Sequence, residues 1–128
     1  MFIKFKSNEE RQTHGGSDFI EIQYCMLPSG TTDREIVDAV HNWDLSSLFI
    51  FGDDFQRFYN EYKEIIGNGL YCNLKEGFID YCGINYYSPE KTIKIIERLK
   101  EREPEEFEIL LDWLLSDLKY NGFYILGV

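Results

Sequence analysis

The sequence has few of the residues and patterns on which catalysis or cofactor binding depends. Only 2 of its 128 residues are histidine and only 3 are cysteine. It lacks the glycine-rich patterns of phosphate-binding and dinucleotide-binding loops, and it lacks the alternating acids of an EF-hand. Neither His14 nor His41 has a cysteine or aspartate at the spacing of a metal site or a catalytic triad. We therefore expect no catalytic residue, no metal and no cofactor.

The cysteines argue against a disulfide-stabilised protein. Cys25, Cys72 and Cys82 are odd in number and form no CxxC pair, which favours reduced thiols, buried in strands. A bridge between Cys72 and Cys82 across a hairpin is the alternative. No apolar run reaches the ~18 residues of a membrane span, and the N-terminal residues alternate too strongly for a signal peptide. We expect a cytoplasmic protein without a membrane partner.

Basic residues are also scarce. The chain has 13 Lys and Arg against 23 Asp and Glu, which gives a net charge of −10. Such a charge repels phosphate backbones, so we expect no nucleic-acid partner. It favours association with a basic protein, because complementary fields speed encounter and select partners. The alternative interpretation is that the acidity serves solubility alone.

The hydrophobic pattern predicts a single α+β domain over residues 1–128. Alternating apolar residues predict strands, and apolar residues at helical spacing predict helices. The first two strands should pair as a hairpin, and the last strand, apolar on both faces, should be central. We expect one antiparallel or mixed sheet of about six strands with about four helices packed against it. The predicted strands lie near 3–5, 20–26, 48–51, 70–74, 78–87 and 123–128, the helices begin near 32, 53, 88 and 104, and 7–17 is a loop.

Two of these predicted elements have one apolar face and one polar face. In the second strand, Ile20, Ile22, Tyr24 and Met26 are predicted to share one face, and Glu21 and Gln23 to lie on the other. In the helix that begins at Thr32, a capping box is predicted from the glutamate three residues later. The apolar face of that helix is predicted to hold Ile36, Val37, Val40 and Trp43.

The carboxylates near the C-terminus are the strongest candidates for a binding surface. Residues 101–117 hold seven acids and one base. In the helix predicted from residue 104, Glu105, Glu108 and Asp112 recur at i, i+3 and i+7 and so share one face. Like charges at this spacing destabilise an isolated helix by a few tenths of a kcal/mol each, whereas a solvated face usually mixes Glu with Lys. The structural alternative is that Glu105 and Glu106 serve the helix N-terminus.

Other acids and one tyrosine extend the candidate surface. Asp53 and Asp54 open a predicted helix, with Asp53 as its N-cap. Asp80 lies in a tyrosine-rich predicted strand that includes Tyr87, and tyrosines are frequent interface anchors. The alternative is that this strand packs in the core on one face and carries ordinary polar residues on the other.

The chain resembles the small acidic immunity proteins, or antitoxins, of bacterial toxin–immunity systems, including contact-dependent growth inhibition. The likeness rests on size, acidity, the lack of catalytic motifs and an aromatic-rich α+β sequence, with residues 77–90 (GFIDYCGINYYSPE) looking like a family signature. The resemblance implies a non-enzymatic protein that binds a cognate toxin domain and covers its active site or substrate groove. Such toxins are often basic nucleases, which would account for the charge.

This hypothesis assigns a toxin-binding surface to acids and one aromatic residue. An acidic adaptor or regulatory interaction module is the alternative function, and a small enzyme using Asp80 or His14 in a pocket is a further one. The oligomeric state is left open. The residues assigned to the toxin-binding surface are Glu105, Glu108, Asp112, Asp53, Asp54, Asp80 and Tyr87.

Overall fold

The computed structural model of this protein describes residues 1–14 and 18–127. Within these residues, seven strands form one antiparallel sheet, accompanied by helices, and the predicted α+β class is confirmed. The elements in chain order are β1 (Phe2–Ile3), α1 (Asn8–Thr13), β2 (Phe19–Tyr24), α2 (Asp33–Asp38), β3 (Leu48–Phe51), the 3-10 helix η1 (Gly52–Asp54), α3 (Phe55–Ile66), β4 (Gly69–Leu70), β5 (Glu76–Gly77), β6 (Ile84–Tyr87), α4 (Pro89–Arg102), α5 (Phe107–Asp117) and β7 (Phe123–Leu126).

The strand order of the sheet is β1-β3-β2-β7-β6-β4-β5. The last strand, β7, is central, as its apolar character on both faces predicts. The predicted hairpin between β1 and β2 is wrong, because both strands pair with β3 instead. Residues from four strands align across the middle of the sheet, since Glu21 pairs with Phe49 on one side and Leu126 on the other, and Leu126 pairs with Ile84.

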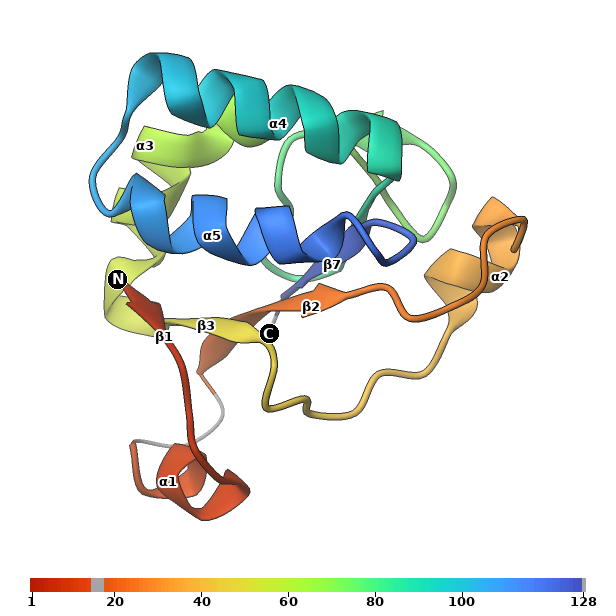
Figure 1. Ribbon diagram of the computed structural model, residues 1–128. Helices are drawn as coiled ribbons and strands as arrows, with labels where there is room; N and C mark the ends of the chain where they lie inside the picture. The colour runs from red at the N-terminus through yellow and green to blue at the C-terminus, as the bar shows by residue number, and fades with distance from the viewer. Residues whose placement is uncertain (15–17, 128) are drawn as a thin grey trace.

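Helices α3, α4 and α5 form a layer on one face of the sheet, as Figure 1 shows. Apolar side chains recur on each helix at i, i+3 and i+4, which directs one stripe per helix toward the strands. On α3 this stripe includes Phe58 and Tyr62, and on α5 it includes Leu110 and Leu114, all fully buried. The main core therefore lies between the sheet and this layer.

The opposite face of the sheet is covered by shorter segments. Helix α2 packs Ile36 and Val37 against this face, and its N-cap is the predicted one, with the Thr32 side chain accepting from the Glu35 backbone N–H at 3.3 Å. The helix ends at Asp38, so the prediction that its apolar face continues is wrong. The residues predicted to continue it, Val40 and Trp43, are 89% and 37% exposed.

Helix α1 interrupts the segment that the sequence predicts as a loop over residues 7–17. Its N-cap is Ser7, whose side chain accepts from the backbone N–H of Glu10 at 3.1 Å. This Ser-x-x-Glu spacing is a capping-box signature that the glycine-rich composition of the segment obscured. Gly15, Gly16 and Ser17, which also belong to the predicted loop, lie outside the described residues.

The region between α3 and α4 contains less strand than predicted. Strand β4 ends at Leu70 and β6 begins only at Ile84, so Cys72 and Cys82 lie in turns and are exposed. Only Cys25 is buried, which corrects the expectation of buried thiols in strands, and all three cysteines are free. No helix within residues 1–14 and 18–127 combines the length and the apolar character needed to cross a membrane.

Candidate functional site

The outward face of α5 combines acidic and apolar side chains. Glu108 and Asp112 are exposed on it, together with Ile109 and Leu115, which are 38% and 43% exposed. At 100° per residue, Glu108, Asp112 and Leu115 lie on the side of the helix away from its buried stripe, and Ile109 lies at the edge between the two. None of the ion pairs among the described residues involves Glu108 or Asp112. Two of the predicted contact residues thus have free carboxylates beside exposed apolar groups.

Glu105 does not share this face, because α5 begins at Phe107 rather than near residue 104. The residue before the helix, Glu106, has a left-handed backbone with φ of 60°, so the preceding turn does not continue the helix. The hydroxyl of Tyr62 donates to the backbone carbonyl of Glu105 at 2.5 Å and ties this turn to α3. The predicted face of three helical carboxylates is therefore wrong for Glu105.

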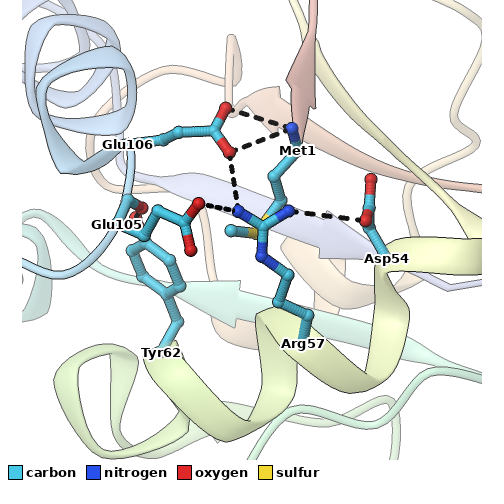
Figure 2. Close-up of polar contacts among 6 residues, drawn as sticks. All are labelled: Met1, Asp54, Arg57, Tyr62, Glu105 and Glu106. Atoms are coloured by element: carbon cyan, nitrogen blue, oxygen red, sulfur yellow. Dashed lines mark hydrogen bonds and ion pairs between the residues drawn. The ribbon is translucent and has the colours of Figure 1, made fainter.

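Arg57 of α3 holds a cluster of carboxylates together, as Figure 2 shows. Its guanidinium pairs with Glu105, with Glu106 at 3.3 Å and with Asp54 at 3.7 Å. The amino group of Met1 donates to both carboxylate oxygens of Glu106, at 3.0 and 3.1 Å. Two cations thus offset three carboxylates, and the cluster links β1, α3 and the α4–α5 turn. Glu105 and Asp54 consequently present less net charge to a partner than the free carboxylates of α5.

Asp53 and Asp80, two further predicted contacts, are both exposed. Asp53 lies in η1 and is not the N-cap of α3. Asp54 occupies the N-cap position, and its side chain makes no capping hydrogen bond. Asp80 lies in the turn before β6, where its Oδ1 accepts from the backbone N–H of Cys82 at 2.9 Å. Neither aspartate is in an ion pair within the described part of the chain, so both are accessible to a partner.

Tyr87 does not reach the surface, so its predicted place on a binding surface is wrong. It is 0% exposed and stacks on Phe123 with 4.8 Å between ring centroids. Its hydroxyl is buried without a hydrogen-bond partner, and burial raises the pKa of that hydroxyl strongly. The residue points into the main core from β6, so only the alternative interpretation, a core residue, fits it.

Asp117, at the end of α5, is a buried acid that the charge pattern alone does not distinguish from its acidic neighbours. It is 1% exposed, and its Oδ1 has no hydrogen-bond partner. Desolvation raises its pKa to about 7, although a hydrogen bond from Thr92 opposes the shift. The carboxyl group is therefore not a fixed charge at neutral pH, and it contributes nothing to the acidic surface.

A pocket of about 440 Å³ opens on the sheet face opposite the α3–α5 layer. Its lining includes the aligned sheet residues Phe49, Glu21, Leu126 and Ile84. Residues from three other segments complete the lining, and sequence reasoning missed the site because these segments are distant along the chain. These further residues include Arg11 of α1, His41, Asn42 and Trp43 of the α2–β3 segment, and Cys82 and Gly83 of the turn before β6.

A chain of hydrogen bonds joins two residues of the pocket lining, Glu21 and His41. Glu21 accepts from the hydroxyl of Ser47 at 2.7 Å and from the side-chain amide of Gln23 at 2.9 Å. The oxygen of that amide lies 3.0 Å from Nδ1 of His41. Burial raises the pKa of Glu21 despite these bonds, and burial lowers the pKa of His41. Glu21 and Gln23, predicted only as the second face of a strand, are therefore buried polar residues, 9% and 7% exposed.

Within the described part of the chain, no hydrogen bond joins a histidine to a cysteine. His14 caps α1 and packs edge-on against Phe5, with 5.7 Å between ring centroids. No hydrogen bond links Cys82 to His41, although both line the pocket. Within residues 1–14 and 18–127, no three His, Cys, Asp or Glu residues are grouped closely enough to hold a metal ion.

Comparison of the chain with protein-family models, with curated proteins and with solved structures found no match in any of the three.

Proposed function

We propose that this chain is an immunity protein that binds a basic toxin domain in the cytoplasm and neutralises it without performing a reaction of its own. The observation that carries the proposal is the outward face of α5, where free carboxylates lie beside exposed apolar side chains. A toxin that cleaves nucleic acid presents a positive groove to phosphates. Carboxylates on a rigid helix suit that groove, and the net charge of −10 adds long-range attraction.

The two kinds of side chain have different roles in this proposal. Glu108 and Asp112 speed encounter with the basic groove, because steering by complementary charge acts mainly on the association rate. Ile109 and Leu115 slow dissociation, because apolar groups that become desolvated at an interface contribute most of its lifetime. The carboxylates held by Arg57 keep the helix layer in place and are peripheral to binding.

Co-expression tests this function directly. The proposal predicts that the gene immediately upstream encodes a toxin with a basic C-terminal domain. That domain is expressed in bacteria with and without this chain, and growth is scored. We expect the domain alone to arrest growth and the chain to restore it. The double variant Glu108→Lys/Asp112→Lys should fail to restore growth, and Leu115→Ala should restore it in part.

The matched control has the same charge change on the opposite side of the molecule. Glu9 of α1 and Glu35 of α2 are exposed, and Glu9→Lys/Glu35→Lys should protect as well as the wild type. Equal loss of protection in both double variants would contradict the placement of the surface on α5. Binding to the upstream domain without any growth protection would favour the alternative function, an acidic adaptor or regulatory module.

A further inference from the structure

The outward face of α5 is too small to form a stable interface by itself. Helix α5 has 11 residues, and its exposed side chains occupy one side of about three turns. A stable protein–protein interface takes about 20–30 residues from each partner. If α5 binds a partner, the contact surface has to continue onto a segment that lies beside the helix.

Helix α4 packs against α5 but has the wrong charge for a basic partner. Pro89–Arg102 contains five Lys and Arg residues and three Glu residues, which gives a net charge of +2. Two of the basic residues, Lys94 and Lys100, are exposed. Like charges placed opposite each other at an interface cost free energy and exclude a partner. We therefore do not expect the contact surface to continue over α4.

The 44–47 turn, which leads into β3, lies on the other side of α5. The indole N–H of Trp113 donates to the backbone carbonyl of Ser46 at 2.7 Å. Ile109, which is 38% exposed, precedes Trp113 by about one helical turn and so lies on this side of the helix. Figure 1 shows α4 above α5 and the segment that leads into β3 below it. Residues 38–47 contain two Asp and no Lys or Arg, so the acidic character of α5 continues in this direction.

Hydrogen bonds hold the 44–47 turn in one conformation. Oδ1 of Asp44 accepts from the backbone N–H of Ser46 at 2.8 Å and from its hydroxyl at 2.7 Å. Oε2 of the buried Glu21 accepts from the backbone N–H of Asp44 at 3.3 Å and from the hydroxyl of Ser47 at 2.7 Å. These bonds fix the backbone on both sides of Leu45, whose apolar side chain is nevertheless 48% exposed. A turn that is ordered before binding loses less entropy on association, so Leu45 is well placed to act as a contact residue.

We propose that the binding surface of this chain runs from α5 across the 44–47 turn and that Leu45 is an apolar anchor in it. The surface then combines apolar side chains from two segments, Ile109 and Leu45, with the exposed carboxylate of Asp112 on α5. The partner that fits is a protein surface with an apolar recess among Lys and Arg side chains. An anchor buried in a recess slows dissociation, and complementary charge around it selects the partner.

The partner is the basic domain of the proposed function, on which this surface depends. A second copy of this chain fits less well, because each copy carries a net charge of −10 and like charges would meet across the contact. The 44–47 turn gives the proposed contact a direction, since the partner extends from α5 toward β3 and leaves α4 exposed to solvent.

Matched truncations of apolar side chains on the two sides of α5 test this direction. Leu45 on the turn and Ile93 on α4 are 48% and 51% exposed, so either can be replaced by alanine without opening the core. Biolayer interferometry with the immobilised upstream-encoded domain measures the association and dissociation rate constants. We expect Leu45→Ala to raise the dissociation rate constant at least fivefold and to leave the association rate constant within about twofold, because no charge changes. Ile93→Ala should change neither, and Leu45→Met, which keeps an apolar side chain of similar size, should dissociate like the wild type.

The outcomes distinguish this surface from the proposed function. If Leu45→Ala dissociates like the wild type while Glu108→Lys/Asp112→Lys associates more slowly, the extension across the turn is overturned and the α5 surface stands. A larger effect of Ile93→Ala than of Leu45→Ala would overturn the direction, because the contact would then continue over α4. Absence of binding between the wild type and the upstream-encoded domain would contradict both proposals. Dimerisation of the chain in sedimentation velocity that Leu45→Ala abolishes would contradict the basic partner and identify a second copy as the occupant.

Discussion

Replacing Asp117 by asparagine should stabilise the protein at pH 8 and change its stability at pH 4 only slightly. The carboxyl group is 1% exposed, and burial raises its pKa to about 7 from 3.8. Well below pH 3.8 the group is protonated in both the folded and the unfolded chain, so it does not affect the free energy of unfolding, and at pH 4 its effect is still small. As the pH rises toward 7, the unfolded chain releases this proton and the folded chain keeps it, so the free energy of unfolding falls.

The size of the effect follows from the gap between the pKa of Asp117 in the unfolded chain, 3.8, and its pKa in the folded chain, about 7. Each unit between the two pKa values lowers the free energy of unfolding by about 1.4 kcal/mol, so a gap of about three units lowers it by about 4 kcal/mol in a rigid site. Relaxation around the ionised carboxylate reduces this, and we expect Asp117→Asn to be more stable than the wild type by about 2 kcal/mol at pH 8. Urea unfolding at pH 4, 6 and 8, followed by circular dichroism, measures the difference. Asp112→Asn, an exposed change on the same helix, is the control and should give a small difference at every pH. A difference for Asp117→Asn that does not grow with pH would refute the reasoning.

Three further predictions concern residues whose surroundings are equally specific. Gly122→Ala should destabilise the protein by more than about 2 kcal/mol in urea unfolding, because φ is 82° and the added carbon would meet the backbone carbonyl of Tyr87; a change below 0.5 kcal/mol would contradict this. Tyr87→Phe should leave stability within about 1 kcal/mol or raise it, because the lost hydroxyl is buried without a partner; a large loss would reveal a hydrogen bond to that hydroxyl. Thiol titration of the folded protein should label Cys72 and Cys82 but leave Cys25 unreacted until denaturant is added, because only Cys25 is buried; labelling of all three in the folded state would be the contrary result.

Helices and strands with a regular apolar period were predictable from the sequence. The stripe of α3 and the apolar character of β7 identified both elements, and β7 is central as expected. The errors came from features that periodicity does not encode. Glu106 has a left-handed backbone, so α5 begins after it and later than predicted. A glutamate at that position does not indicate a left-handed conformation. The hairpin between β1 and β2 was wrong because strand pairing depends on long-range packing with β3.

The candidate sites were predictable only in part. Acid spacing correctly identified Glu108 and Asp112 as surface carboxylates, because helical period determines which side faces solvent. The same kind of reasoning wrongly placed Tyr87 at the surface. An aromatic residue in a strand can be an interface anchor or a core residue. The outcome depends on whether helices cover its face of the sheet, which the pattern of a single strand does not show. The pocket around Glu21 and His41 joins segments that are close only after the sheet has formed. A single polar residue in a predicted strand does not predict such a pocket.

The salt dependence of association tests the central claim most directly, namely that the α5 surface presents negative charge to a positively charged protein. The association rate constant with the upstream-encoded domain is measured by stopped flow between about 20 and 500 mM salt. For the wild type we predict a steep fall with salt, and for Glu108→Lys/Asp112→Lys, whose net charge is −6 rather than −10, a rate about tenfold lower at 20 mM salt with a shallower slope. The Glu9→Lys/Glu35→Lys variant has the same net charge and should keep most of the wild-type rate. Identical rates and slopes for the wild type and the α5 variant would contradict the account.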